Sequence, residues 1–343
     1  EGAVVKRRVQ NHTWAILLIG GMLTAELAYC ADKKSKNHEE TTISGPGILW
    51  REPMDIASRK LYYGAGGEEH QPKPPFQFVK EDLEGSSPKF TVTDAENVSW
   101  KVKLGQEARP ETAATRLAWA VGYFTDEDYL FRNMQVQGLP VRLHRGQNLI
   151  SRDGEIAYAR LKRESKSEKK LGIWDWRDPY WSNSRELNGL KVIMALLNNW
   201  DLKNINNQVI EKDGERIFKV KDMGASFGTP GRSFPQSRAK DNLEEYKKSQ
   251  FIRRTTDDTV DFTTPARPQF VYLVNPKEYT QRVKMESLGH DIPREDVWWM
   301  GQLLACLSPK QIRDAFRAAG YSDADVEEFA AVIEKRIAML TDL

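Results

Sequence analysis

The sequence predicts an α+β fold with two lobes, a small lobe of antiparallel strands with one helix and a larger, mainly helical lobe. At 343 residues the chain is longer than a single hydrophobic core usually supports. Three strand patterns, at 76–79, 90–93 and 98–104, precede one helix pattern that begins near Pro110. Helical patterns dominate after residue 150. We therefore expect the small lobe at 45–149 and the large lobe at 150–343.

The charges and cysteines exclude several classes of protein. The chain has 51 basic and 49 acidic residues and a net charge of +2, so no overall field indicates a nucleic-acid partner. Cys30 and Cys306 are too few for a metal cluster or a disulfide framework. Because Cys306 lies in the apolar stretch 298–307, we expect it to be a buried structural thiol.

The first 30 residues have the pattern of a secretory signal peptide. Lys6, Arg7 and Arg8 precede an apolar run at 14–25, and Ala28 is a small residue before a possible cleavage site. The run is too short for a normal membrane span, although an uncleaved anchor is the alternative. Residues 27–30 also resemble a bacterial lipoprotein box, but lipidation of Cys30 is disfavoured because the bulky Tyr29 lies where that box has a small residue. A polar linker is expected at 31–44. This pattern predicts a secreted or periplasmic protein.

The later segments alternate between helices and polar stretches. Helices are expected at about 184–197, 295–307, 309–319 and 323–337, each with a capping residue or a proline at its start. The run at 161–170 is dense in charge and is expected to be a solvated loop.

Two polar loops joined by a hairpin carry the strongest functional pattern. In the first loop, Asp201 is followed by Lys203 and Asn206. Strands at 207–210 and 216–220, with an Asp-Gly turn between them, then lead to Asp222 in the second loop. Phosphoryl transfer needs a carboxylate that orients a hydroxyl, a cation and metal ligands at such spacings.

These loops resemble those of protein kinases. The run D-L-K-N-I-N, at 201–206, resembles the catalytic loop H-R-D-L-x-x-x-N, and D-M-G, at 222–224, stands where D-F-G would. The longer run D-M-G-A-S-F-G is similar to the metal-binding segment of atypical kinases, including phosphoinositide kinases, HipA-like kinases and secretory-pathway kinases. Asn199 and Trp200 replace His-Arg, Met223 replaces Phe and no A-P-E follows, which favours an atypical relative.

The resemblance implies a nucleotide site in the small lobe. Gly85, Ser86 and Ser87 form a hairpin tip where a kinase has its Gly-rich loop. Lys103 and Glu111 correspond to the strand Lys and helix Glu that hold the ATP phosphates, with Lys101 and Glu107 as near alternatives.

The same resemblance implies roles for the two loops. Asn206 and Asp222 would hold Mg²⁺ or Mn²⁺, Asp201 would position the acceptor hydroxyl, and Lys203 would stabilise the transferring phosphoryl group.

Two other functions remain open at this stage. The first is a catalytically inactive, kinase-like binding or scaffold protein of the cell envelope. A metal-dependent hydrolase would use Asp201 and Asp222 with His144 or His290, although no paired-histidine spacing supports it. For a kinase, the acceptor could be a protein, a lipid or a sugar.

Overall fold

The computed structural model describes residues 40–85, 87–229, 240–265 and 276–343. The predicted signal peptide and most of the predicted linker, up to residue 39, lie outside the described residues. Within the described part of the chain, no helix has the length and apolar character needed to span a membrane.

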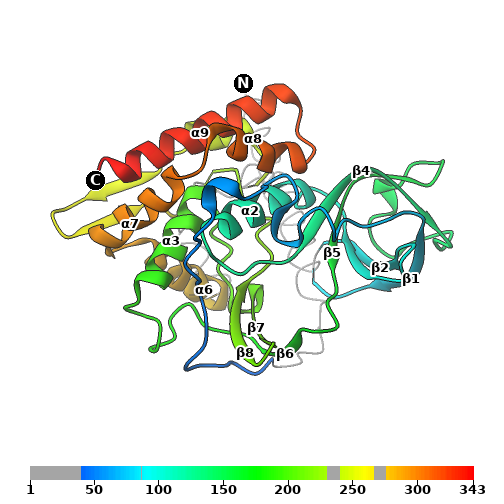
Figure 1. Ribbon diagram of the computed structural model, residues 1–343, viewed down its shortest axis with the longest axis horizontal. Coiled ribbons are helices and arrows are strands. Elements are labelled where there is room, and N and C mark those ends of the chain that lie inside the picture. The colour runs from blue at the N-terminus through cyan, green and yellow to red at the C-terminus, as the bar shows by residue number, and fades with distance from the viewer. Residues whose placement is uncertain (1–39, 86, 230–239, 266–275) are drawn as a thin grey trace, which may run out of the picture. The chain divides into compact units, whose positions relative to one another are not determined.

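Five strands close into a barrel in the order β1-β2-β3-β5-β4 (Figure 1). Their bounds are Phe76–Asp82, Lys89–Thr93, Ser99–Lys103, Asp128–Gln137 and Glu155–Arg163 for β1 to β5. The three predicted strands are confirmed as β1, β2 and β3. The barrel is not wholly antiparallel as predicted, because β1 and β4 pair in parallel where the barrel closes.

The strand β5 corrects the expectation of a solvated loop at 161–170 for residues 161–163, whereas 164–168 lie outside any strand. This strand pairs with both β3 and β4, and Leu161 is fully buried. The lysines and arginines of β5 misled the prediction, because several of them are neutralised by carboxylates instead of facing water.

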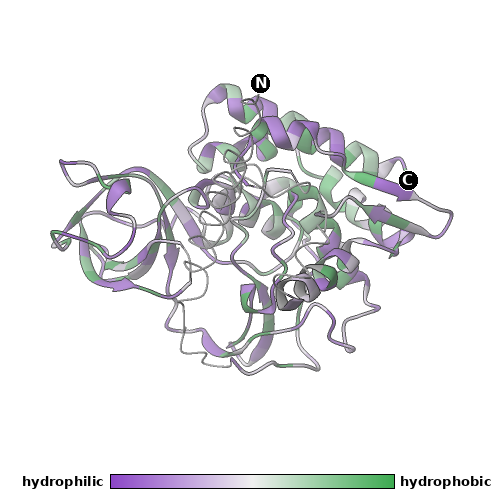
Figure 2. Ribbon diagram, turned by 180° about the vertical axis from the view of Figure 1, so that it is seen from behind, coloured by the Kyte–Doolittle hydropathy of each residue, from purple (hydrophilic) through white to green (hydrophobic). Residues whose placement is uncertain are grey.

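The barrel and the rest of the described chain have separate hydrophobic cores. Alternate residues of the strands, among them Phe90, Val92, Trp100 and Val102, fill the barrel. A larger core lies among the helices and includes α2 (Ala108–Ala120) and α3 (Arg185–Leu197). Purple and green segments alternate along the helices, as expected for elements with one polar and one apolar side (Figure 2).

The remaining described elements are helices and two three-stranded sheets. The sheets have the orders β6-β7-β8 and β11-β10-β9. The strand bounds are Lys169–Gly172, Asn207–Lys212, Glu215–Val220, Ile252–Thr255, Thr259–Phe262 and Ile292–Pro293 for β6 to β11. The helices are α4 (Leu243–Lys248), α6 (Pro276–Glu286), α7 (Arg294–Ala305), α8 (Pro309–Ala318) and α9 (Asp323–Thr341). The larger part of the chain is therefore a mixture of helices and sheets.

The helix starts follow the predicted capping residues. Ser184 accepts a hydrogen bond from the backbone N–H of Leu187 at the start of α3. Ser308 and Gln311 form a reciprocal capping box at the start of α8, and Ser322 caps α9.

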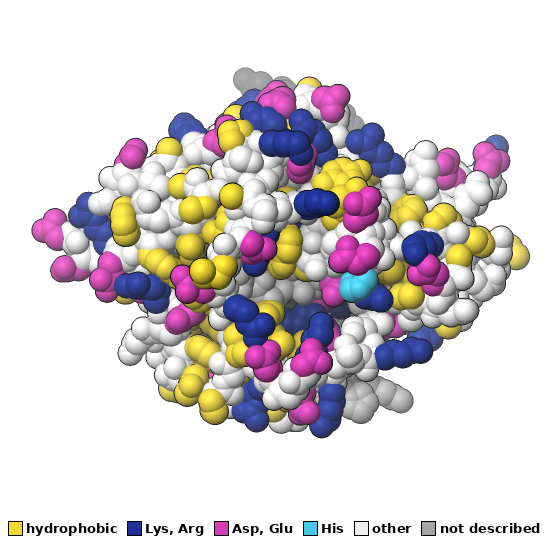
Figure 3. Space-filling model, viewed as in Figure 1, with side chains coloured by type: hydrophobic (Ala, Val, Ile, Leu, Met, Phe, Trp, Pro, Cys, Tyr) yellow, Lys and Arg dark blue, Asp and Glu magenta, His cyan; other side chains and the backbone are white. Residues whose placement is uncertain are grey.

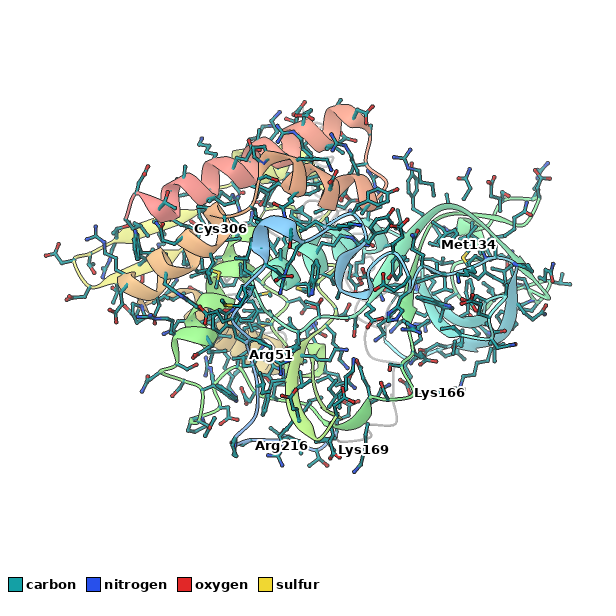
Figure 4. All side chains as sticks on the ribbon, viewed as in Figure 1. Arg51, Met134, Lys166, Lys169, Arg216 and Cys306 are labelled. Atoms are coloured by element: carbon teal, nitrogen blue, oxygen red, sulfur yellow. The ribbon has the colours of Figure 1, made fainter. Side chains whose placement is uncertain are left out.

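Cys306 is exposed, contrary to prediction. It caps the C-terminus of α7, where Figure 4 labels it, whereas Leu304 and Leu307 on either side are buried. The apolar character of 298–307 therefore did not reveal that Cys306 faces away from the core.

Candidate active site

Lys103 is the centre of the candidate site. It is the last residue of β3, and only 3% of its surface is exposed. Its Nζ atom lies 2.7 Å from Glu107 Oε2, 2.9 Å from Glu111 Oε2 and 2.6 Å from Asp222 Oδ1. A buried ammonium group needs such partners, because burial without them would strongly disfavour its charge.

The two glutamates reach Lys103 from the start of α2. Glu107 is the N-cap residue and Glu111 lies in the first turn. Four residues separate them, so they lie on the same side of the helix. Glu111, the predicted partner of the lysine, and Glu107, the alternative to it, therefore both contact Lys103.

Asp222 joins the lysine from the loop that follows β8. Its backbone is left-handed, with a φ of 56°. Gly224 passes close to α2, and a Cβ atom at this position would lie 2.6 Å from the Cβ of Glu107. This close approach explains why a glycine follows Met223 in the D-M-G run.

Arg160 is a further member of the site that the sequence did not reveal. Its Nη2 atom lies 2.5 Å from Glu111 Oε1, and both side chains are buried. Arg160 is the register partner of Lys103 across β3 and β5. Glu111 is therefore held between a lysine and an arginine from adjacent strands.

The charges of the site shift its pKa values strongly. Burial alone would lower the pKa of Lys103, but Glu111, Asp222 and Glu107 together raise it well above its usual range. Burial alone would raise the pKa of Glu107, but Lys103 and Lys240 hold it well below its usual range. Lys103 is therefore cationic, and Glu107 anionic, at neutral pH.

Asp201, Lys203 and Asn206 form a second group of contacts. Asp201 Oδ1 lies 2.7 Å from Lys203 Nζ. The Asn206 side-chain amide donates to the backbone oxygen of Asp201 at 2.7 Å and to Asp201 Oδ2 at 3.2 Å. The amide nitrogen of Asn206 is thus directed at Asp201, which leaves Oδ1 as the atom that can bind a ligand.

The β7–β8 hairpin connects the two groups. Asn207 pairs with Val220, and the N–H of Lys221 donates to the carbonyl oxygen of Asn206 at 3.1 Å. Asn206 and Asp222 therefore lie at the same end of the hairpin.

The donor atoms at this end of the hairpin fit Mg²⁺ or Mn²⁺. One carboxylate and one amide oxygen are hard ligands, and Mg²⁺ is usually held by one or two protein carboxylates together with substrate phosphates. In the described ranges no group of three or more His, Cys, Asp or Glu residues forms a site of its own for a metal ion.

The hairpin tip between β1 and β2 lies next to Glu107. Ser87 Oγ donates to Glu107 Oε2 at 2.9 Å, and the carbonyl oxygen of Gly85 accepts from Arg145 at 2.5 Å. Ser86 lies outside the described residues. The structure brings Ser87 to the carboxylates around Lys103, but shows no function for the tip.

Lys101 occupies a different position from Lys103. Its Nζ atom lies 3.7 Å from Asp82 and 3.9 Å from Glu164, and a third of its side chain is exposed. These contacts favour Lys103 as the lysine of the site.

The two histidines of the hydrolase alternative do not join the site. His144 bonds to Glu81 at 2.9 Å, and its side chain is largely exposed. Among the described residues, no hydrogen bond or ion pair connects His144 or His290 with Asp201 or Asp222.

A cavity of about 670 Å³ opens beside the first loop. Its lining includes Leu202, Lys203 and Ile205 of this loop, together with Asp175, Arg177 and Lys284. Arg177 is fixed by hydrogen bonds of 2.7 Å to the Lys284 carbonyl oxygen and 2.6 Å to Ser287 Oγ. The cavity is large enough for a small molecule or a side chain of a larger acceptor.

On the face of the molecule shown in Figure 3, basic and acidic side chains are interspersed. The site around Lys103 also combines both charges, because Lys103 and Arg160 lie among Glu107, Glu111 and Asp222.

Comparisons with known proteins add two structural likenesses. No family model and no curated protein matches the chain. The structure is similar to that of the proinflammatory kinase CtkA of Helicobacter pylori, with 10% identity, a TM-score of 0.42 and coverage of 78% of this chain and 98% of that chain. It is also similar to the Golgi casein kinase, with 9% identity, a TM-score of 0.31 and coverage of 92% and 90%. Both TM-scores are low, and the assignment of a function depends instead on the contacts around Lys103.

Proposed function

We propose that this protein is an atypical, ATP-dependent phosphotransferase with a kinase-like fold. The observation that carries the proposal is the meeting of Lys103 with Glu111 and Asp222, at 2.9 Å and 2.6 Å. These residues come from a strand, a helix and a loop, and 119 residues separate Lys103 from Asp222. A strand lysine, a helix glutamate and the aspartate of an Asp-x-Gly loop form the conserved arrangement that protein kinases use to orient ATP.

In this proposal Lys103 binds the nucleotide phosphates, and Glu111 holds the lysine in place with support from Arg160. Asp222 and Asn206 Oδ1 would hold Mg²⁺ or Mn²⁺, which supplies positive charge to the phosphates when bound. Because Lys103 is buried and fixed by three carboxylates, its charge is oriented before the substrate arrives.

Asp201 and Lys203 act at the acceptor. The acceptor hydroxyl oxygen forms a bond to the γ-phosphorus while the bond from this phosphorus to the β–γ bridging oxygen breaks, and ADP leaves. Asp201 orients the hydroxyl and takes its proton, and Lys203 stabilises the charge on the transferring group. The acceptor would approach from the cavity that Lys203 lines, where Arg177 and Lys284 favour an acceptor with negative charge.

The test is nucleotide binding by the native chain and by Asp222→Asn. Asparagine keeps the shape of the side chain and tolerates the left-handed backbone at this position, but it removes the negative charge. Asp213→Asn is a matched control, because Asp213 also has a left-handed backbone, with a φ of 53°, at the tip of the same hairpin.

We expect ATP with Mn²⁺ to raise the melting temperature of the native chain and of Asp213→Asn, because a ligand that binds only the folded state stabilises it. Asp222→Asn should lose most of this increase. A native chain that does not respond to ATP with Mn²⁺ would contradict the proposal and favour a scaffold that has kept the site without its function.

A further inference from the structure

Three basic residues stand side by side on one face of the barrel. Lys89 on β2, Lys103 on β3 and Arg160 on β5 are consecutive register partners, and Asp82 on β1 pairs with Lys89. Side chains of directly opposed residues lie on the same face of a sheet. The next residues of β2 and β3, Phe90 and Val102, point into the barrel core, so the charged row lies on the outer face, where α2 provides Glu111.

Among the described residues, Lys89 is the one member of this row whose charge has no ion-pair partner. Arg160 is paired with Glu111, and Lys103 with three carboxylates. For Lys89, the described part of the chain provides no hydrogen bond or ion pair to its ammonium group. The carboxylate of Asp82, its neighbour on β1, lies instead 3.7 Å from Lys101.

The environment of Lys89 makes this unusual. The residue is half-buried, and burial lowers its pKa, although the nearby carboxylates of Asp82, Asp222 and Glu111 act in the opposite direction. Lys89 is therefore a partly buried cation beside Lys103 that has no direct ion pair among the described residues.

Lys89 also lies at the hairpin tip. A Cβ atom at Gly85 would be 3.4 Å from Lys89 Nζ. Ser87, which follows this tip, bonds to Glu107, so the segment 85–87 approaches both Lys89 and a carboxylate of the site.

We propose that Lys89 forms, with Lys103, a second phosphate-binding position for the polyphosphate chain of the nucleotide. The inference rests on the proposed function and adds Lys89 to the proposed nucleotide site. A polyphosphate would supply the direct, charge-assisted contact that the described residues do not give to the Lys89 ammonium, and an ammonium is well suited to bind phosphate as a point charge.

The test compares Lys89→Met, which keeps the aliphatic stem, with Lys89→Arg, which keeps the charge. Lys80→Met is the matched control, because Lys80 is an exposed lysine on β1 whose register partner, Thr91, lies on the same outer face of β2. Affinities are measured from the melting temperature at increasing concentrations of ATP with Mn²⁺, and separately of inorganic tripolyphosphate.

We expect Lys89→Met to bind ATP and tripolyphosphate about 10- to 100-fold more weakly than the native chain, the effect of losing one charge-assisted hydrogen bond. Lys89→Arg should stay within a few-fold of the native chain, and Lys80→Met should not differ from it. Without ligand, Lys89→Met should melt at the native temperature or above it, because burial disfavours the charge that the substitution removes. A lower melting temperature would show that Lys89 is structural and would overturn the inference.

The outcomes also separate this inference from the proposed function. If the native chain binds ATP and Lys89→Met binds it equally well, Lys89 is not a phosphate-binding residue and the proposed function stands. If the native chain binds tripolyphosphate through Lys89 but does not bind ATP, the phosphate position stands and the nucleotide function fails. Binding of neither ligand by the native chain would overturn both.

Discussion

Substitution of Lys103 by methionine should destabilise the protein by an amount that depends on pH. At the site, Lys103, Arg160 and Lys240 balance Glu107, Glu111 and Asp222. Methionine leaves one uncompensated negative charge in a largely buried site. Breaking a buried ion pair costs about 3–5 kcal/mol. Because Glu111 keeps Arg160 and Glu107 keeps Lys240, we expect the lower end, about 3 kcal/mol at pH 7.

The pH dependence follows from Glu107. Lys103 and Lys240 depress its pKa in the folded state, so its stabilising contribution is complete above its unfolded pKa of 4.5 and is lost as the pH falls below that value. The difference between the native chain and Lys103→Met should therefore shrink between pH 7 and pH 4, by less than about 1 kcal/mol, because Lys240 still lowers the pKa of Glu107 in the variant.

Urea unfolding of both chains at the two pH values measures this difference. Lys80→Met serves again as a control and should change the free energy of unfolding by less than about 0.5 kcal/mol, as exposed substitutions usually do. Equal stability of Lys103→Met and the native chain at pH 7 would refute the ion-pair network. A difference that is the same at pH 7 and pH 4 would refute the role of the Glu107 charge.

Two further substitutions test the packing around Lys103. Gly224→Ala should weaken ATP binding at least about 10-fold, because the new methyl group would lie 2.6 Å from the Cβ of Glu107 and must displace the start of α2. Unchanged binding in a thermal titration would show that this close approach is unimportant. Arg160→Lys should lower the free energy of unfolding, measured in urea, by about 1.5–3 kcal/mol, because lysine keeps the charge but is too short to reproduce the arginine contact with Glu111. A loss under about 0.5 kcal/mol would argue against a positioning role for Arg160.

The sequence was informative where a short segment determines the structure. The Asp-Gly turn, the capping residues and the strand patterns are local signals, and the structure confirms the hairpin and helices that they predicted. The short spacing within 201–206 also brings Asp201, Lys203 and Asn206 into contact. Their chemical roles remain predictions.

The rest of the site depends on strand register, which the sequence does not specify. Lys89 and Arg160 neighbour Lys103 only because β2 and β5 pair with β3 in one particular alignment. The basic residues of β5 resembled a solvated loop, since nothing in their own segment reveals the carboxylates that neutralise them. Similarly, spacing could not decide between Glu107 and Glu111, because one helical turn brings both to the same lysine.

Formation of ADP from ATP with Mn²⁺ by the native chain, Asp222→Asn and Asp213→Asn shows directly whether the protein is a phosphotransferase that uses Asp222. ADP forms whether the phosphoryl group goes to an added acceptor, to the protein itself or to water, so the acceptor need not be known. We predict that the native chain and Asp213→Asn form ADP at similar rates, and that Asp222→Asn is at least about 100-fold slower. Native protein that forms no ADP above the buffer background, or Asp222→Asn that is as fast as the native chain, would contradict this prediction.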